Sequence, residues 1–115
     1  MDIVRHIING AEIAEAARTG QVFDPATGQV SKQVAFASTA EVDRAIAAAA
    51  SALPAWRETS LIKRADVFFR LRQLLKERTP ELAAIVTSEH GKVLSDAAGE
   101  VSRGIENVEF CLLYT

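Results

Sequence analysis

The sequence lacks several features that define whole classes of protein. Its single cysteine cannot form an internal disulfide. Charged residues interrupt every apolar stretch well before the roughly 18 residues that a membrane-spanning helix needs, and the N-terminus has neither the basic start nor the apolar core of a signal peptide. The 13 basic and 15 acidic residues give a formal charge of −2, without the basic excess that favours nucleic acid or anionic membranes. We therefore expect a soluble cytoplasmic protein that binds neither nucleic acid nor membrane.

Phosphate-binding loops are absent as well. The sequence contains neither G-x-G-x-x-G nor G-x-x-x-x-G-K-[ST], and Gly91-Lys92 is followed by Val93 rather than by a hydroxyl residue. The composition, with 49% hydrophobic and 24% charged residues, is typical of globular proteins. A length of 115 residues suffices for one small domain but not for two. We expect the chain alone to bind no cofactor.

From Ile3 to Ala37 the sequence is typical of strands and turns. Asn9-Gly10 lies between apolar residues and predicts a tight hairpin turn. Residues 24–28, Asp-Pro-Ala-Thr-Gly, predict a second turn, because proline fixes one φ angle and glycine permits a positive one. Residues 33–37 are predicted to form a short strand.

From Ser38 onward we expect four helices. Ser38 and Glu41 make a capping box, in which each side chain can satisfy a backbone amide at the helix start. Pro54 is expected to end this first helix, because proline lacks the amide hydrogen that a helix interior requires. The apolar stripe between these points consists of Val42, Ala45, Ile46, Ala49 and Leu53.

A second helix is predicted to begin after Ser60. The basic pairs that it carries, Lys63-Arg64 and Arg70–Arg72, have no aromatic platform between them, so we interpret them as a solvated face rather than a nucleic-acid site. The residues expected to face inward are Leu61, Ala65, Phe68 and Leu75. Those expected to face outward are Lys63, Asp66, Arg70, Gln73 and Glu77.

A third helix is predicted at Thr79-Pro80, with Thr79 as its cap and Pro80 as its first residue. It should end near Gly91. His90 and Lys92 are interpreted as capping residues, because cations are favoured at a helix C-terminus. The side chains that this helix should bury are Leu82, Ile85 and Val86.

The last predicted helix, residues 93–115, has apolar residues on two sides. One face consists of Leu94, Ala97, Ala98, Val101, Ile105, Val108 and Leu112. The opposite side carries Gly99, Arg103, Phe110 and Tyr114. Such a helix is expected to lie between two layers. No Gly, Asn or Pro follows to terminate it, so we expect the chain to be the front piece of a larger protein.

The order of these segments resembles the N-terminal part of the aldehyde dehydrogenase superfamily. The matching segments are residues 23–28, Ala55-Trp56, Arg64 and residues 89–92. Residues 99–109, Gly-Glu-Val-Ser-Arg-Gly-Ile-Glu-Asn-Val-Glu, are similar to the CoA-acylating branch, methylmalonate-semialdehyde dehydrogenase. The resemblance runs through essentially all 115 residues and covers the N-terminal part of a dehydrogenase domain.

The resemblance implies an α+β segment of an α/β enzyme, in which a hairpin and short strands precede four helices packed on a Rossmann-like NAD domain. It implies NAD as cofactor, CoA as co-substrate and a homo-oligomer. The substrate would be a semialdehyde acid, methylmalonate or malonate semialdehyde, which a thiolate attacks before CoA takes the acyl group and CO₂ is lost. The family's catalytic cysteine, general-base Glu, oxyanion-stabilising Asn and NAD-binding Lys have no counterpart here, so we expect this chain alone to be inactive.

Arg103 is the residue that the resemblance connects most directly with substrate. In this branch, an arginine in the Gly-Glu-Val-x-Arg-Gly setting is expected to line the substrate entrance. A guanidinium offers a fork of donors that matches a carboxylate, which semialdehyde acids carry and alkyl aldehydes lack. The alternative is a pair on the helix itself, with Glu100 or with Asn107, worth ~0.2–0.5 kcal/mol.

Glu89 has two interpretations. With the carbonyl groups around Val22 and Phe23, it matches the place where some family members bind a structural monovalent cation, and such oxygens suit hard cations. The simpler interpretation is a solvated residue in the last turn of a helix. Its negative charge is unfavourable at that end of a helix, which is the physical support for the cation.

Two further residues are given structural roles. Cys111 has no histidine nearby in the sequence, and free cysteines are often buried, so we interpret it as a buried packing residue rather than a nucleophile. Trp56 is expected to fill the corner between the first two helices.

A different class of protein is the alternative: a small standalone helical module whose exposed apolar faces bind a partner without catalysis. That module predicts a sharp two-state melt. A piece of a larger enzyme instead predicts exposed apolar patches, weak cooperativity and self-association.

Overall fold

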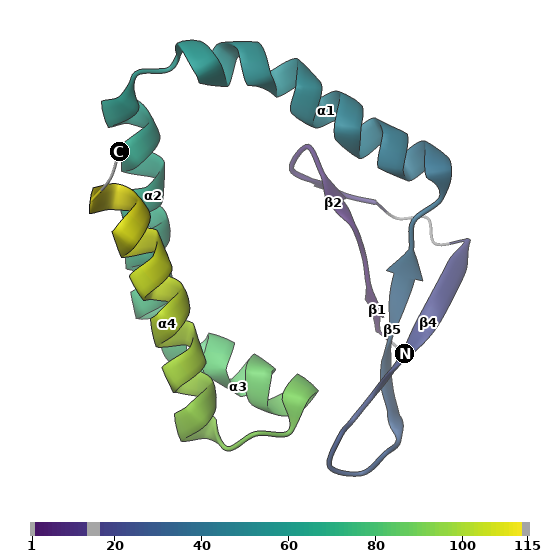
Figure 1. Cartoon of the computed structure of the whole chain (residues 1–115). Helices are drawn as coiled ribbons and strands as arrows, with labels where there is room; N and C mark the ends of the chain where they lie inside the picture. The colour runs from purple at the N-terminus through teal and green to yellow at the C-terminus, as the bar shows by residue number, and fades with distance from the viewer. Residues whose placement is uncertain (1, 14–16, 114–115) are drawn as a thin grey trace. The chain divides into compact units, whose positions relative to one another are not determined.

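A computed structural model describes residues 2–13 and 17–113, and these form two compact units that divide between Glu58 and Thr59. The strands of the first unit are β1 (Ile3–Val4), β2 (Ile7–Ile8), β3 (Ala11–Glu12), β4 (Arg18–Phe23) and β5 (Val30–Phe36) (Figure 1). The helices are α1 (Thr39–Glu58) in the first unit, and α2 (Leu61–Glu77), α3 (Thr79–His90) and α4 (Leu94–Leu113) in the second. Short strands followed by four helices are the predicted order. Among residues 2–13 and 17–113, none of the four helices has the combination of length and hydropathy that a membrane span requires.

The hairpin predicted at Asn9-Gly10 is confirmed. β2 pairs antiparallel with β3, and Ile8 lies opposite Ala11. Asn9 and Gly10 have φ angles of 53° and 76°. Positive φ at both central residues defines a type I′ turn, whose twist matches that of the two strands it joins.

β5 is the middle strand of a three-stranded sheet with the order β1-β5-β4. β4 runs antiparallel to it, with Arg18 opposite Phe36, whereas β1 runs parallel, with Ile3 opposite Gln33. β5 therefore starts earlier than the strand predicted at 33–37 and ends one residue sooner. Its added residues complete the ladder with β4, a pairing that the local sequence pattern does not contain.

The predicted turn at residues 24–28 joins β4 to β5. The amide of Ala26 donates to Asp24 Oδ1 at 2.7 Å, and the amide of Gly28 donates to the Asp24 carbonyl at 2.7 Å. Gly28 has a φ of 70°, which a residue without a Cβ adopts at little cost. Asp24 therefore organises the turn with both its side chain and its backbone.

α1 begins at the predicted capping box but does not end at Pro54. The amide of Glu41 donates to Ser38 Oγ at 3.2 Å, and the amide of Ser38 donates to Glu41 Oε2 at 2.6 Å. The helix then continues to Glu58 with Pro54 inside it. Proline removes one amide hydrogen, and the residue whose carbonyl loses that donor, Ala50, is exposed to water. The predicted end at Pro54 is therefore wrong.

The helix ends of the second unit follow the predicted signals with one exception. Ser60 Oγ accepts a hydrogen bond from the amide of Lys63 at 3.4 Å and so caps α2. α3 ends at Gly91, which has the left-handed conformation with a φ of 83°. Thr79 is not the cap of α3, contrary to the prediction. Only Arg78 separates the two helices, and the Thr79 hydroxyl donates to the Leu75 carbonyl in the last turn of α2 at 2.8 Å.

Small residues lie at the centre of the second unit. α4 packs against both α2 and α3, and Figure 1 shows it running alongside α2. Ala83 on α3 is 1% exposed and Ala97 on α4 is 0% exposed, while Ile105 is also buried. Alanine at a helix contact lets the two backbones approach closely. The predicted inner face of α4 is confirmed from Ala97 to Leu112, whereas Tyr114 lies outside the described residues.

Many large apolar side chains of the second unit lie at its surface. Four that were predicted to face inward or to be buried are exposed: Leu61, Phe68, Ile85 and Leu94. Other exposed apolar residues on α2 are Ile62, Val67, Phe69, Leu71 and Leu74. Helical periodicity identifies an apolar face, but not whether a neighbouring element covers it. α2 is thus exposed and apolar on more than one side, unlike a surface helix with a single apolar stripe.

Candidate functional site

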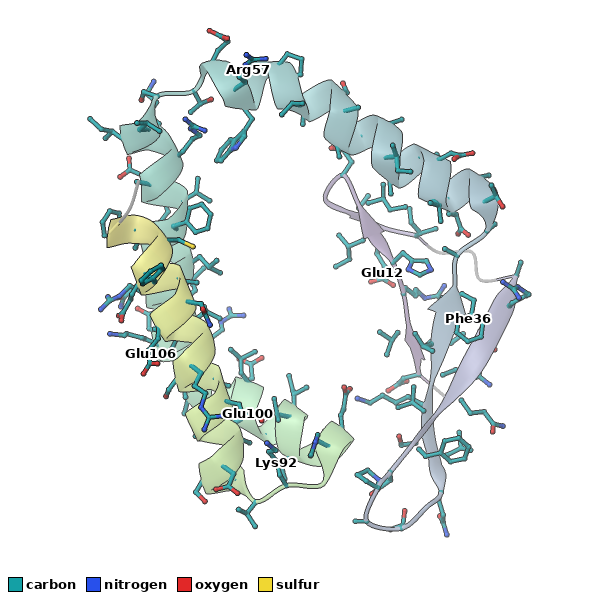
Figure 2. All side chains as sticks on the ribbon, in the orientation of Figure 1. Glu12, Phe36, Arg57, Lys92, Glu100 and Glu106 are labelled. Atoms are coloured by element: carbon teal, nitrogen blue, oxygen red, sulfur yellow. The ribbon has the colours of Figure 1, made fainter. Side chains whose placement is uncertain are left out.

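The candidate site surrounds Arg103 in the middle of α4. Arg103 is exposed and lies one turn after Glu100 on the same helix. Lys92, in the connection between α3 and α4, forms an ion pair with Glu100. Figure 2 shows both labelled side chains near the beginning of α4. The side chain of Lys92 is 19% exposed and that of Glu100 is 45% exposed, so the ammonium is the more buried partner.

Lys92 is the main electrostatic influence on Glu100. The hydrogen bond from its ammonium group, followed by its charge, holds the pKa of the Glu100 carboxyl below the ordinary value. Partial desolvation raises this pKa, and the positive charges of His90 and Arg103 lower it to a smaller extent. Arg103 is therefore a secondary neighbour of Glu100.

The other partner considered on the helix, Asn107, is engaged with the backbone. Its Nδ2 donates to the carbonyl of Arg103 at 3.0 Å. Within residues 2–13 and 17–113, no hydrogen bond or ion pair holds the Arg103 guanidinium. At Gly99 and Gly104, which lie on either side of Arg103 in the sequence, an added Cβ would meet nothing within 4 Å. The surface beside Arg103 is therefore open.

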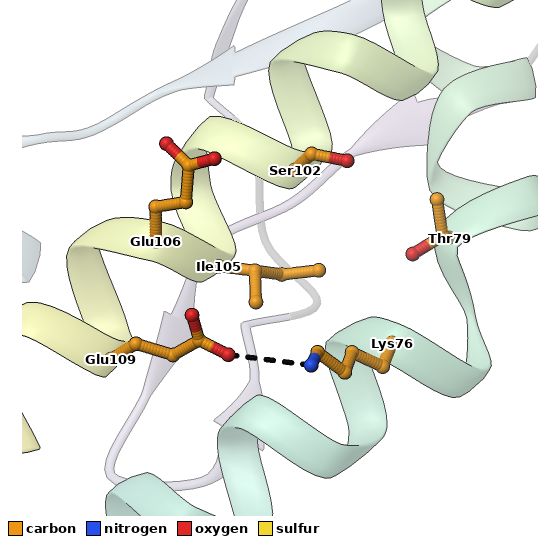
Figure 3. Close-up of a pocket in the computed structure, with 6 residues that line it drawn as sticks. All are labelled: Lys76, Thr79, Ser102, Ile105, Glu106 and Glu109. Carbon is orange, nitrogen blue, oxygen red and sulfur yellow. Dashed lines mark ion pairs between the residues drawn. The ribbon is translucent and has the colours of Figure 1, made fainter.

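A second charged cluster joins α2 to α4. Arg72 Nε lies 2.6 Å from Glu109 Oε1. Lys76 Nζ lies 3.3 Å from the same oxygen, and Figure 3 shows this second pair. The hydrogen bonds from these two cations hold the pKa of the Glu109 carboxyl below its ordinary value. The interpretation of Arg72 as part of a solvated helix face is therefore wrong, because this side chain bridges two helices.

A shallow depression of about 290 Å³ lies beside this cluster (Figure 3). Its lining residues are Lys76, Thr79, Ser102, Ile105, Glu106 and Glu109. The Thr79 and Ser102 hydroxyls donate to backbone carbonyls of Leu75 and Ala98, so neither hydrogen is available to a ligand. The depression thus has the character of a helix–helix seam rather than a binding pocket.

Glu89 is exposed in the last turn of α3. The carbonyl groups predicted to share a cation with it belong to Val22 and Phe23 on β4, in the other unit. The cation site therefore stays a prediction. Among the residues that the structure describes, no three His, Cys, Asp or Glu side chains gather as metal ligands would.

Cys111 is exposed on α4, contrary to the prediction that it is buried. At about 100° per residue, it lies about 120° around the helix from Ile105, the buried residue of the inner face. It therefore sits on the flank of α4, although its sequence neighbours Val108 and Leu112 are half-buried.

Sequence reasoning missed both ion-pair clusters. Lys92 and Glu100 are 8 residues apart across the turn at Gly91, and Arg72 and Glu109 are 37 residues apart. Helical spacing relates only residues three or four apart. Opposite charges on either side of a predicted helix boundary were the available signal for the first cluster, and no local signal exists for the second.

Comparison with known proteins places this geometry in a family. The model of the "Aldehyde dehydrogenase family" matches residues 13–114. A malonate-semialdehyde dehydrogenase of Pseudomonas aeruginosa is 44% identical over 110 residues, which are 96% of this chain and 22% of that protein. The crystal structure of methylmalonate-semialdehyde dehydrogenase from Oceanimonas doudoroffii matches with a TM-score of 0.94 and 46% identity, over 97% of this chain and 23% of that one.

A Sinorhizobium meliloti protein crystallised with NAD is also similar, with a TM-score of 0.93 and 40% identity over 97% of this chain and 23% of that one. The chain thus spans less than a quarter of the length of each of these relatives.

Proposed function

The chain belongs to the aldehyde dehydrogenase family, and on that basis we propose that it is the N-terminal portion of an NAD-dependent enzyme that oxidises malonate or methylmalonate semialdehyde. The product would be an acyl-CoA, formed with loss of CO₂. Similarity to malonate- and methylmalonate-semialdehyde dehydrogenases, at 44% and 46% identity, supports the substrate class. The NAD-bound relative supports the cofactor. CoA as co-substrate rests on the resemblance to the acylating branch.

The residues present here fit substrate binding better than cofactor binding. The sequence has no glycine-rich dinucleotide motif, so we assign neither NAD nor CoA to them. When bound in the proposed enzyme, NAD would supply the acceptor for the hydride of the aldehyde. The exposed apolar side chains of α2 would pack on a Rossmann-like NAD domain, and the complete enzyme would be a homo-oligomer. The 115-residue chain alone is expected to reduce no NAD.

The observation that supports the substrate assignment most directly is that Arg103 is exposed and has no partner among the described residues. Arg103 is exposed, while Glu100 is engaged with Lys92 and Asn107 with the backbone. A planar fork of donors binds a carboxylate through two parallel hydrogen bonds. Arg103 would therefore hold the carboxylate of the semialdehyde and leave the aldehyde end for the chemistry.

This proposal is tested in the full-length enzyme with Arg103→Leu. Loss of charged hydrogen bonds should raise KM for malonate semialdehyde about 10- to 100-fold. KM for propanal, which has no carboxylate, should change less than about twofold. Arg103→Lys, which keeps the charge but not the fork, is the matched control and should lie between. Equal changes for both aldehydes would rule out the anchor.

A further inference from the structure

We propose that Lys92 is a positioning residue that keeps Arg103 available to substrate by engaging Glu100. This inference rests on the proposed function, because it concerns the carboxylate anchor of that enzyme. Glu100 lies three residues before Arg103 on α4, the spacing at which opposite charges on a helix attract. A Glu100–Arg103 pair would occupy the guanidinium and place a negative charge beside the incoming carboxylate. Both effects would weaken substrate binding.

The position of Lys92 is set by the backbone as well as by its own long stem. Gly91 adopts the left-handed conformation, and its amide donates to the Thr87 carbonyl at 2.9 Å. This cap ends α3 and sends the chain into the short connection before α4, where Lys92 lies. The mostly buried side chain of Lys92 then reaches Glu100 across the first turns of α4. The ammonium group thus meets the Glu100 carboxylate from outside the helix that carries Arg103.

The relative effects of the neighbouring cations on Glu100 support its pairing with Lys92 rather than with Arg103. The hydrogen bond and charge of Lys92 act on the Glu100 carboxyl more strongly than His90 or Arg103 does. The other acidic residue one turn from Arg103, Glu106, lines the depression that α4 forms with Lys76 and Thr79. Lys92 therefore engages the carboxylate that lies one turn before Arg103.

The test is a double-mutant cycle in the full-length enzyme. Lys92→Met should raise KM for malonate semialdehyde about two- to fivefold, because Glu100 is released to pair with Arg103. KM for propanal should stay within about 1.5-fold of wild type. Adding Glu100→Gln should return KM for malonate semialdehyde to the wild-type value, because no carboxylate remains to compete. Lys92→Arg, which keeps the charge, should also behave as wild type.

Lys63→Met makes the same chemical change at an exposed lysine of α2 and is the matched control. If Lys92→Met does not fold, Lys92→Gln also removes the charge and replaces the ammonium group with a neutral polar amide on a shorter side chain. A rise in KM for both aldehydes alike, or a double variant as impaired as Lys92→Met, would overturn the positioning role.

Failure of the proposed function has a different signature. In that case Arg103→Leu itself does not distinguish malonate semialdehyde from propanal, and the positioning role falls with it. If Arg103→Leu distinguishes the two aldehydes and Lys92→Met does not, only the positioning role is overturned.

Discussion

The two units of this protein are specified in different ways. In the first, backbone ladders and short-range turns determine the structure, as at Asn9-Gly10 and at the Ser38–Glu41 capping box. In the second unit, the structure is determined by side chains that pack between helices, such as Ala83 and Ala97. The turns and the cap of the first unit lie within a few residues and can be found by inspection, whereas the pairing of β4 with β5 cannot. The packing of the second unit depends on which helices contact one another. The two units should therefore respond differently to mutation.

The largest difference is expected from enlarging an alanine at the helix contact. Ala97 is 0% exposed, so Ala97→Leu needs room that α3 and α4 do not leave. It should lower the free energy of unfolding of the second unit by about 3 kcal/mol without changing the first. Hydrogen exchange measured by mass spectrometry reports each unit separately. Ala47→Leu, at an exposed position on α1, is the control, and unchanged protection of α3 and α4 would contradict the tight contact.

A smaller effect, confined to the first unit, should follow from Ser38→Ala. This change removes the hydroxyl that accepts the Glu41 amide and should cost about 1 kcal/mol. Amides in the first turn of α1 should exchange faster, while those of α2 keep their rates. Thr39→Ala, one residue further into the helix, removes a hydroxyl without removing the cap. Equal effects of the two substitutions would show that the capping box contributes little.

Glycine substitution should have opposite signs in the two units. Gly99→Ala adds a Cβ that meets nothing within 4 Å on α4, so it should stabilise the second unit by roughly 0.5–1 kcal/mol. Gly10→Ala places a side chain at a φ of 76° and should destabilise the first by about 1 kcal/mol. Chemical unfolding of the two variants measures both changes. A destabilising Gly99→Ala would reveal a close neighbour of α4.

The smallest effect should come from Glu109→Gln, and it should depend on pH. Arg72 and Lys76 lower the pKa of Glu109, so their stabilising contribution is present above its ordinary value of 4.5 and is lost as pH falls through the lowered pKa. The variant should therefore unfold at a lower urea concentration than wild type at neutral pH, and at the same concentration in strong acid. A difference that persists in acid would mean that the glutamate acts through packing.

Local chemistry accounts for what could be predicted. The turns, the start of α2 after Ser60 and the end of α3 at Gly91 each depend on a few adjacent residues, and all are found where expected. The predictions that were wrong concern exposure to solvent and contacts with residues far away in the sequence. α1 continues through Pro54, where the residue four positions earlier, Ala50, is exposed, and Cys111 is exposed on the flank of the inner face of α4. A hydrophobic pattern cannot supply either fact.

The candidate site also contains one residue that could be predicted from the sequence and others that could not. Arg103 could be selected from its own short motif, because a lone arginine on an otherwise apolar helix side calls for an explanation. The residues that determine what Arg103 can bind could not be selected in this way. Lys92 reaches Glu100 across a turn whose path depends on Gly91. A sequence motif thus indicates the residue proposed to bind substrate, Arg103, more readily than it indicates Lys92, which engages the competing carboxylate of Glu100.

The parallel pairing of β1 with β5 bears on the order in which the molecule forms. Ile3 and Gln33 are partners although 30 residues separate them in the chain, and in the second unit 37 residues separate Arg72 from Glu109. During synthesis at roughly 5–20 residues per second, β1 waits on the order of seconds for β5 to emerge. Helices form in about a microsecond. The first strand to be made therefore has no partner until β5 emerges, and until then its backbone is open to pairing with other chains.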